Sequence, residues 1–154
     1  GDVIYTKQAI EIFQKEKYDK LFLLGDIGYR TIELLNPLHD RILAVSGNCD
    51  SFDETDLARF PMPPITFDYD FGRFIVLTHG HYYTPYDYTQ PYGIFLSGHT
   101  HMSQIITKSD GKIIANPGSL ACPRDYNHSY LEMTDTGLKV KDIETGEIVH
   151  FLDY

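Results

Sequence analysis

Residues 20–26, KLFLLGD, carry the pattern that decides the fold. The apolar run is too short for a buried helix, and it stops at a glycine followed by an acidic residue, which favours a strand buried on both faces of a parallel sheet. A second run of the same kind, residues 41–45, ends just before Gly47-Asn48, and a short helix predicted over residues 31–35 lies between the two runs. Strand, helix and strand in alternation predict a β-α-β unit with parallel strands.

The rest of the chain predicts helices early and antiparallel strands late. Residues 4–17 place apolar side chains such as Ile10 and Phe13 at helical spacing, which predicts an amphipathic helix. Further strands are predicted at residues 65–71, 73–78, 93–97, 103–107, 112–115, 130–133, 138–143 and 147–152, some joined by tight turns such as Asp110-Gly111. We therefore expect an α/β fold, a two-sheet β-sandwich flanked by helices, formed as a single domain by residues 1–154.

Composition limits the classes of function. The 154 residues suffice for one domain with a real core, and the hydrophobic share of 42% is that of an ordinary globular protein. The net charge of −9 argues against a broad nucleic-acid-binding face, but it allows a phosphate substrate if bound cations supply the positive charge.

No apolar run reaches the roughly 18 residues of a membrane span, and no signal peptide is evident, so we expect a cytoplasmic protein without a membrane partner. Cys49 and Cys122 are too few for a disulfide framework or a thiolate zinc site.

Side chains that can bind a metal follow the ends of four apolar runs, each beside a glycine. They are Asp26, Asn48, the pair His79 and His81, and the pair His99 and His101. Open α/β sheets bind ligands outside the C-terminal ends of their strands, so we expect these side chains to converge. Imidazole, carboxylate and amide ligands together suit a first-row divalent ion. Asp26 has two oxygens and can bridge two ions about 3.5–4 Å apart, the separation found in two-metal phosphatases.

Each of these signals has an ordinary structural explanation when taken alone. A Gly-Asp pair after a strand and an asparagine after Gly47 are common in turns, and His99 and His101 share one face simply because they alternate. The coincidence of four such runs in one small chain favours the metal interpretation. His39, His128 and His150 lack this context, and we interpret them as structural or surface residues.

The sequence resembles the calcineurin-like metallophosphoesterases, and more narrowly their small bacterial and archaeal phosphodiesterases of the YfcE type. The motifs that carry this resemblance are Gly25-Asp26, Gly47-Asn48-Cys49-Asp50, His79-Gly80-His81, Gly98-His99-Thr100-His101 and Asn116-Pro117-Gly118-Ser119. They occur in order, at compatible spacing, over essentially the whole chain. The resemblance implies a four-layer fold and two divalent metal ions, with Mn²⁺ favoured and Ni²⁺, Zn²⁺ or Fe as alternatives.

The resemblance also implies roles for individual residues. Asp26 would bridge both ions, Asn48, His79 and His99 would complete one site, and His101 would belong to the other. The catalytic residues implied are Asn48, which also positions the substrate, Cys49, Asp50 and His81, a close neighbour of the ions. Asn116 and Ser119 would bind substrate from a loop that flanks the pocket.

The chain departs from the family pattern at two places. Family members open with a strand that ends in Asp-x-His, and this motif does not occur here, so we expect the chain to lack its first strand and the native protein to have about ten further residues before Gly1. The second departure is Cys49, where many members have a histidine that protonates the leaving group. A thiol is a weak donor, which predicts weak general-acid catalysis and a preference for leaving groups that depart without a proton.

These observations predict a metal-dependent phosphoesterase, and the resemblance favours a phosphodiesterase that attacks small phosphodiesters with hydroxide held between two ions. The rival is a non-catalytic scaffold of the same fold, like a retromer subunit, although four intact ligand-type residues argue against it: Asn48, His79, His99 and His101. A nuclease of the superfamily would need a capping domain and a basic surface. Residues 82–92 contain five tyrosines. We favour a structural role, in which they cover the core or form a subunit contact; the alternative is that they stack on an aromatic group of the substrate. A homo-oligomer is left open.

Overall fold

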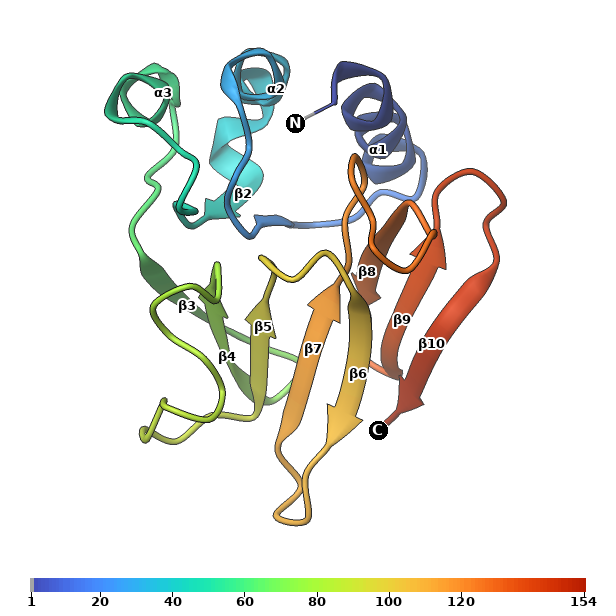
Figure 1. Ribbon diagram of the computed structural model, residues 1–154. Helices are drawn as coiled ribbons and strands as arrows, with labels where there is room; N and C mark the ends of the chain where they lie inside the picture. The colour runs from blue at the N-terminus through green and yellow to red at the C-terminus, as the bar shows by residue number, and fades with distance from the viewer. Residues whose placement is uncertain (1) are drawn as a thin grey trace.

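The computed structural model describes residues 2–154 as a layered α/β structure (Figure 1). Its helices are α1 (Val3–Lys15), α2 (Tyr29–Leu35), the 3₁₀ helix η1 (Asn36–Arg41) and α3 (Phe52–Leu57). Its strands are β1 (Leu21–Leu23), β2 (Ile42–Ala44), β3 (Ile65–Asp70), β4 (Arg73–Thr78), β5 (Ile94–Ser97), β6 (Ser103–Thr107), β7 (Ile113–Pro117), β8 (Ser129–Met133), β9 (Gly137–Asp142) and β10 (Ile148–Asp153). The predicted upstream strand and Gly1 lie outside the described residues.

The strands form three sheets, two of which contain the parallel strands that the sequence predicts. Strands β1 and β2 pair in parallel, and five strands in the order β3-β4-β5-β7-β6 form a mixed sheet whose central pairs, β4 with β5 and β5 with β7, are parallel. Strands β8, β9 and β10 form an antiparallel meander. The layer that faces the five-stranded sheet is thus divided into two sheets.

The core lies between the five-stranded sheet and the other two sheets. Its central cluster combines Val45 at the end of β2 with Ile75 and Leu77 of β4 and Leu138 of β9, and Phe22 and Leu43 pack against it. On the opposite face of β2, Ile42 and Ala44 pack against the helices. Because β2 is buried on both faces, its sequence is apolar without alternation, as in parallel strands generally.

The helices form a separate layer over β1 and β2 (Figure 1). Helix α2 contributes Ile32 and Leu35 to the cluster beneath it, and Asp2 caps α1 by accepting hydrogen bonds from the amides of Ile4 at 2.8 Å and Tyr5 at 3.1 Å. None of the helices in the described part of the chain is long and apolar enough to span a membrane.

The predicted fold class, an α/β sandwich flanked by helices, is confirmed. Predicted ends lie within two residues of the observed ones for every predicted strand, but the helices η1 and α3 were missed. Helix α3 has only six residues and no apolar periodicity, so its signal was the cap alone: Ser51 Oγ accepts the amide of Glu54 at 3.1 Å.

Tyrosines of the segment 82–92 have two different environments. Tyr92 is buried and packs with Phe95 and Val76 on the outer face of the five-stranded sheet, with Tyr88 against them. Tyr82 and Tyr86 remain 74% and 81% exposed. Covering the core therefore explains only part of this tyrosine-rich segment.

Candidate metal centre

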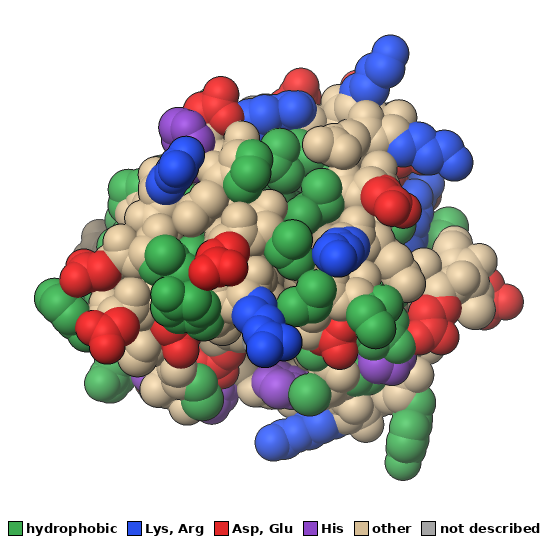
Figure 2. All heavy atoms as spheres, turned by 90° about the horizontal axis from the view of Figure 1, so that it is seen from above, with side chains coloured by type: hydrophobic (Ala, Val, Ile, Leu, Met, Phe, Trp, Pro, Cys, Tyr) green, Lys and Arg blue, Asp and Glu red, His purple; other side chains and the backbone are tan. Residues whose placement is uncertain are grey.

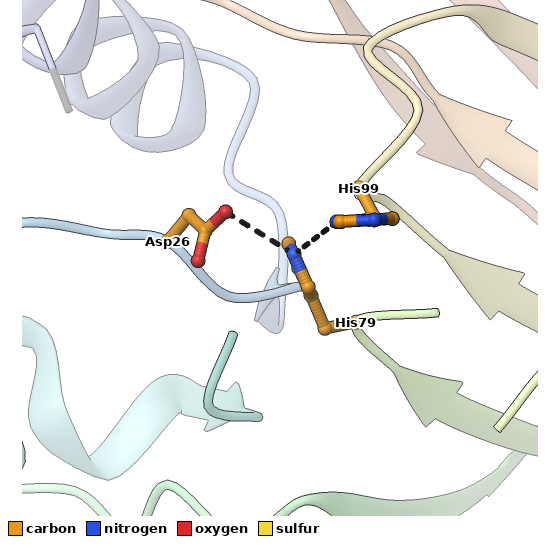
Figure 3. Close-up of side chains that lie close together, drawn as sticks. All are labelled: Asp26, His79 and His99. Atoms are coloured by element: carbon orange, nitrogen blue, oxygen red, sulfur yellow. Dashed lines mark hydrogen bonds and ion pairs between the residues drawn. The ribbon is translucent and has the colours of Figure 1, made fainter. Parts of the chain in front are cut away.

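The predicted convergence of strand ends occurs at the junction between the helical layer and the five-stranded sheet. Asp26 follows β1, His79 follows β4 and His99 follows β5, and in each case the chain turns at or next to a glycine. Figure 3 shows their side chains directed toward a common point. One ligand-type atom from each of the three residues lies within 4.8 Å of the others.

His79 is the most buried member of this group and has one fixed orientation. Its side chain is 2% exposed, and Nδ1 lies 2.6 Å from the backbone carbonyl oxygen of Leu24. A carbonyl only accepts, so Nδ1 carries the proton and Nε2 keeps its lone pair. A backbone carbonyl that fixes the tautomer in this way is the usual second partner of a metal-binding histidine.

Nε2 of His79 faces other atoms that also carry lone pairs. It lies 2.9 Å from Asn48 Oδ1, 3.2 Å from Asp26 Oδ2 and 3.1 Å from His99 Nδ1. A proton on Nε2 could be donated to only one of these atoms, whereas a cation between them would be attracted to all. One carboxylate, one amide oxygen and two imidazole nitrogens are a ligand set that suits a divalent first-row ion. The residues present therefore fit a metal ion.

Two glycines permit this close approach. Gly25 has φ of +96°, and a Cβ there would lie 2.7 Å from both the backbone nitrogen of Gly47 and Nδ1 of His79. A Cβ on Gly47 would collide with the carboxylate of Asp26. Contacts as short as these do not occur for real side chains, so both positions require glycine.

Backbone strain is concentrated at the candidate ligands. Six non-glycine residues have positive φ in the described part of the chain, and three of them are Asp26, His99 and His101, with φ of 54°, 67° and 60°. This left-handed conformation is unfavourable for such residues and persists only where surrounding contacts impose it, often at functional sites.

Asp50 connects the loop after β1 to the loop after β2. Its carboxylate accepts hydrogen bonds from the amides of Gly47 at 2.7 Å, Asp26 at 2.8 Å and Ile27 at 2.9 Å. Asp26 in turn accepts from the amide of Cys49 at 2.8 Å through Oδ1, so its Oδ2 remains directed at His79.

Asn116 in the same way holds the loop after β5, which carries His99. Its side chain is 6% exposed and donates to the carbonyl oxygen of Gly98 at 2.9 Å and to Thr100 Oγ1 at 3.1 Å, and its Oδ1 accepts from Gly118. These contacts hold the turn that carries His99. Ser119 Oγ accepts from the amide of Cys122 at 3.0 Å.

The remaining predicted site residues surround the group. His101 is not among the three clustered ligands, and its Nδ1 lies 2.7 Å from the carbonyl oxygen of Cys122, which leaves Nε2 free to bind a metal. His81 packs edge-on against His79, with ring centroids 5.2 Å apart. Burial and the neighbouring imidazoles of His79 and His99 lower the pKa of His81 below its ordinary value. Cys49 is exposed, and the carboxylate of Asp26, together with slight burial, raises the pKa of its thiol.

An open pocket of about 450 Å³ adjoins the ligand group. Asn48 and His81 form its boundary with the candidate metal site, and Phe52, Met62 and Tyr82 line it further out. The sequence patterns did not predict Phe52 or Met62 as part of a site, because neither belongs to a motif with chemical groups at fixed spacing.

Comparison with known proteins identifies the family and supports the fold. The sequence profile of the calcineurin-like phosphoesterase superfamily domain matches residues 2–137. Phosphodiesterase YfcE of Escherichia coli strain K12 is 29% identical over 153 residues, which cover 88% of this chain and 82% of that protein. The solved structure of YfcE, a phosphoesterase from E. coli, aligns with a TM-score of 0.92 at 25% identity and covers 99% of this chain and 93% of that one. Vacuolar Protein Sorting 29 from Cryptosporidium parvum shares the fold, with a TM-score of 0.68 at 20% identity over 96% of this chain and 88% of its own.

Proposed function

The chain belongs to the calcineurin-like phosphoesterase superfamily, and on that premise we propose that it is a metal-dependent phosphodiesterase acting on small phosphodiesters. The observation that carries the proposal is the close group of ligand-type atoms around Nε2 of His79. Asp26 Oδ2, Asn48 Oδ1 and His99 Nδ1 all lie within 3.2 Å of that nitrogen. Two of the four residues, Asp26 and His99, are also held at positive φ, a conformation that is often retained at functional sites.

Asp26, Asn48, His79 and His99 would hold one divalent ion, with Mn²⁺ favoured. Asp26 and His101 are the ligands that this chain offers to a second ion. Ions bound there would lower the pKa of a water molecule that they share, so that hydroxide is available near neutral pH, and would neutralise charge on the phosphoryl oxygens.

Residues other than the ligands hold the ligand-bearing loops in place or face the pocket. Asp50 and Asn116 hold the ligand-bearing loops through hydrogen bonds to backbone groups, so we assign them positioning roles in place of direct contact with substrate. His81 has a buried Nδ1 without a hydrogen-bond partner in the part of the chain that the structure describes, and it lines the pocket beside Asn48. Its lowered pKa favours the neutral imidazole, whose single N–H can donate a hydrogen bond to an oxygen of a phosphate ester.

The surface favours a small substrate. Among the described residues, acidic and basic side chains are mixed over the helical face, without a continuous basic stripe of the kind that tracks a nucleic-acid backbone (Figure 2). The preference for diesters is supported by the relation to phosphodiesterase YfcE.

The test is metal-dependent hydrolysis. Protein stripped with a chelator should lose activity on bis(p-nitrophenyl) phosphate and regain it with Mn²⁺, and it should act more slowly on p-nitrophenyl phosphate. Full activity in excess chelator would refute the metal mechanism. Metal binding without hydrolysis of any diester would favour the scaffold alternative.

A further inference from the structure

The pocket beside the ligand group has aromatic side chains at its rim that the fold itself does not use. Phe52, the first residue of α3, is 80% exposed, and Tyr82 is 74% exposed. An aromatic side chain stabilises a fold through the apolar area that it buries, so the fold gains little from either of these exposed rings. Single exposed aromatic residues are ordinary, but these two line the same pocket and flank Asn48 and His81.

The two rings come from different layers of the fold. Phe52 belongs to α3 in the helical layer, and Tyr82 follows β4 of the five-stranded sheet (Figure 1). The pocket that both residues line therefore takes its walls from both layers. Tyr82 is backed by the imidazole of His81, with ring centroids 4.2 Å apart and planes inclined by 41°. The side chain of Met62 adds an apolar, polarisable surface.

The charges of the pocket limit what can enter it. Among the described residues that line it there is no lysine or arginine, and Asp50 contributes a carboxylate. Ser51 and Thr55 supply hydroxyl groups, which can bind neutral polar atoms. A ligand with a second anionic group would therefore have no counter-ion here, whereas a flat uncharged ring would find aromatic faces and an apolar wall.

We propose that this pocket binds an uncharged aromatic group of the substrate, an aryl ring or a nucleobase, against Phe52 and Tyr82. The inference rests on the proposed phosphodiesterase function and adds a substrate class to it: monoanionic diesters with at least one neutral aromatic ester group. Stacking of a ring on an aromatic side chain typically raises affinity by roughly tenfold or more.

The experiment compares inhibitors of equal charge that differ in aromaticity. Diphenyl phosphate and diethyl phosphate are tested against hydrolysis of methyl p-nitrophenyl phosphate by the metal-loaded protein. The wild type should bind diphenyl phosphate about tenfold more tightly than diethyl phosphate. F52A and Y82A should reduce this preference severalfold, whereas Y82F should keep it. Because both side chains are exposed, neither alanine variant removes a core contact.

The matched control is Y86A, which removes a tyrosine of the same segment that is 81% exposed and does not line the pocket. It should leave the preference and the activity unchanged. Bis(4-carboxyphenyl) phosphate should bind about tenfold more weakly than diphenyl phosphate, and equal binding would contradict the exclusion of anionic rings.

Outcomes for the two proposals are separable. An active wild type whose preference for diphenyl phosphate survives in both F52A and Y82A would overturn the aromatic pocket and leave the phosphodiesterase function standing. A wild type that hydrolyses no diester would overturn both.

Discussion

Asp50 accepts a hydrogen bond from the backbone amide of Asp26 at 2.8 Å, so one acidic residue positions another without placing their charges in contact. The same carboxylate also binds the amide of Gly47 at 2.7 Å and thereby ties the loop after β1 to the loop after β2. Both loops carry candidate ligands, so the hydrogen bonds of Asp50 fix the position of these ligands relative to one another.

We predict that D50N weakens metal binding while the protein remains folded. The NH₂ group of the new side chain would face the backbone N–H groups from which Asp50 now accepts hydrogen bonds. Two donors cannot pair, so the loops after β1 and β2 would separate or rotate. Loss of such an outer-shell partner typically costs about 10–100-fold in metal affinity. Calorimetric titration with Mn²⁺ measures the change, and an unchanged affinity would show that Asp50 does not set the ligand geometry.

Gly25 should tolerate no side chain. In G25A the new Cβ would lie 2.7 Å from Nδ1 of His79, and alanine is strained at φ of +96°. We expect destabilisation of about 1–3 kcal/mol and loss of activity, because the ring of His79 must move. G72A is the control, since Gly72 has a similar positive φ of +71° but open space around it. Equal loss of activity in the two variants would count against the packing argument.

Cys49 offers a test of the leaving-group step. If position 49 provides the proton for the leaving oxygen, the wild type should show a steep dependence of rate on leaving-group pKa, because a thiol is a poor donor. C49H should accelerate poor leaving groups most, and general acids are typically worth about 10²–10⁴-fold. C49S should change little. A series of aryl and alkyl diesters gives the slopes, and parallel slopes for wild type and C49H would mean that residue 49 is not the acid.

Glu132 lies away from the candidate metal site, and its environment predicts that the stability of the fold depends on pH. Burial acts to raise the pKa of this carboxyl, but hydrogen bonds from Tyr18 and from Lys141, at 3.0 Å, outweigh it and hold the pKa below its ordinary value. A carboxyl with a depressed folded pKa stabilises the fold above its unfolded pKa of about 4.3, and this contribution is lost as the pH falls through the folded value.

In urea unfolding, E132Q should therefore be less stable than wild type by about 1 kcal/mol above pH 5, and the gap should narrow as the pH falls from the unfolded pKa through the lower folded pKa. E147Q, in the exposed turn before β10, is the matched control and should show no such gap. A difference for E132Q that stays constant down to pH 3 would contradict the linkage.

The sequence predicts the ligand-bearing strand ends well because the C-terminal ends of parallel strands meet at one edge. Asp26, His79 and His99 follow that rule, and glycine beside each ligand marks the turn. The sequence could not show that Leu24 fixes the tautomer of His79, since 55 residues separate them. Nor could it show that Asn116 braces the turn before His99, because that depends on hydrogen bonds across the sheet.

Local signals also failed where tertiary contacts decide. Helix α3 was missed because six residues with a single cap give no periodicity. Phe52 and Tyr82 line one pocket only because the fold brings the helical layer and the five-stranded sheet together. The five tyrosines of residues 82–92 were expected to cover the core or to form a subunit contact. Tyr88 and Tyr92 pack on the outer face of that sheet, but no sequence pattern separates them from the exposed Tyr82 and Tyr86.

The measurement that tests the central claim most directly is Mn²⁺ binding to chelator-treated protein, wild type against H99A. His99 is exposed, so its removal leaves the core intact while taking one lone pair from the group around Nε2 of His79. Affinity should fall by at least about 100-fold, and diester hydrolysis should fall with it. H39A, which removes a histidine of η1 outside the ligand group, should bind as the wild type does. Equal Mn²⁺ affinity in wild type and H99A would contradict the assignment of this site.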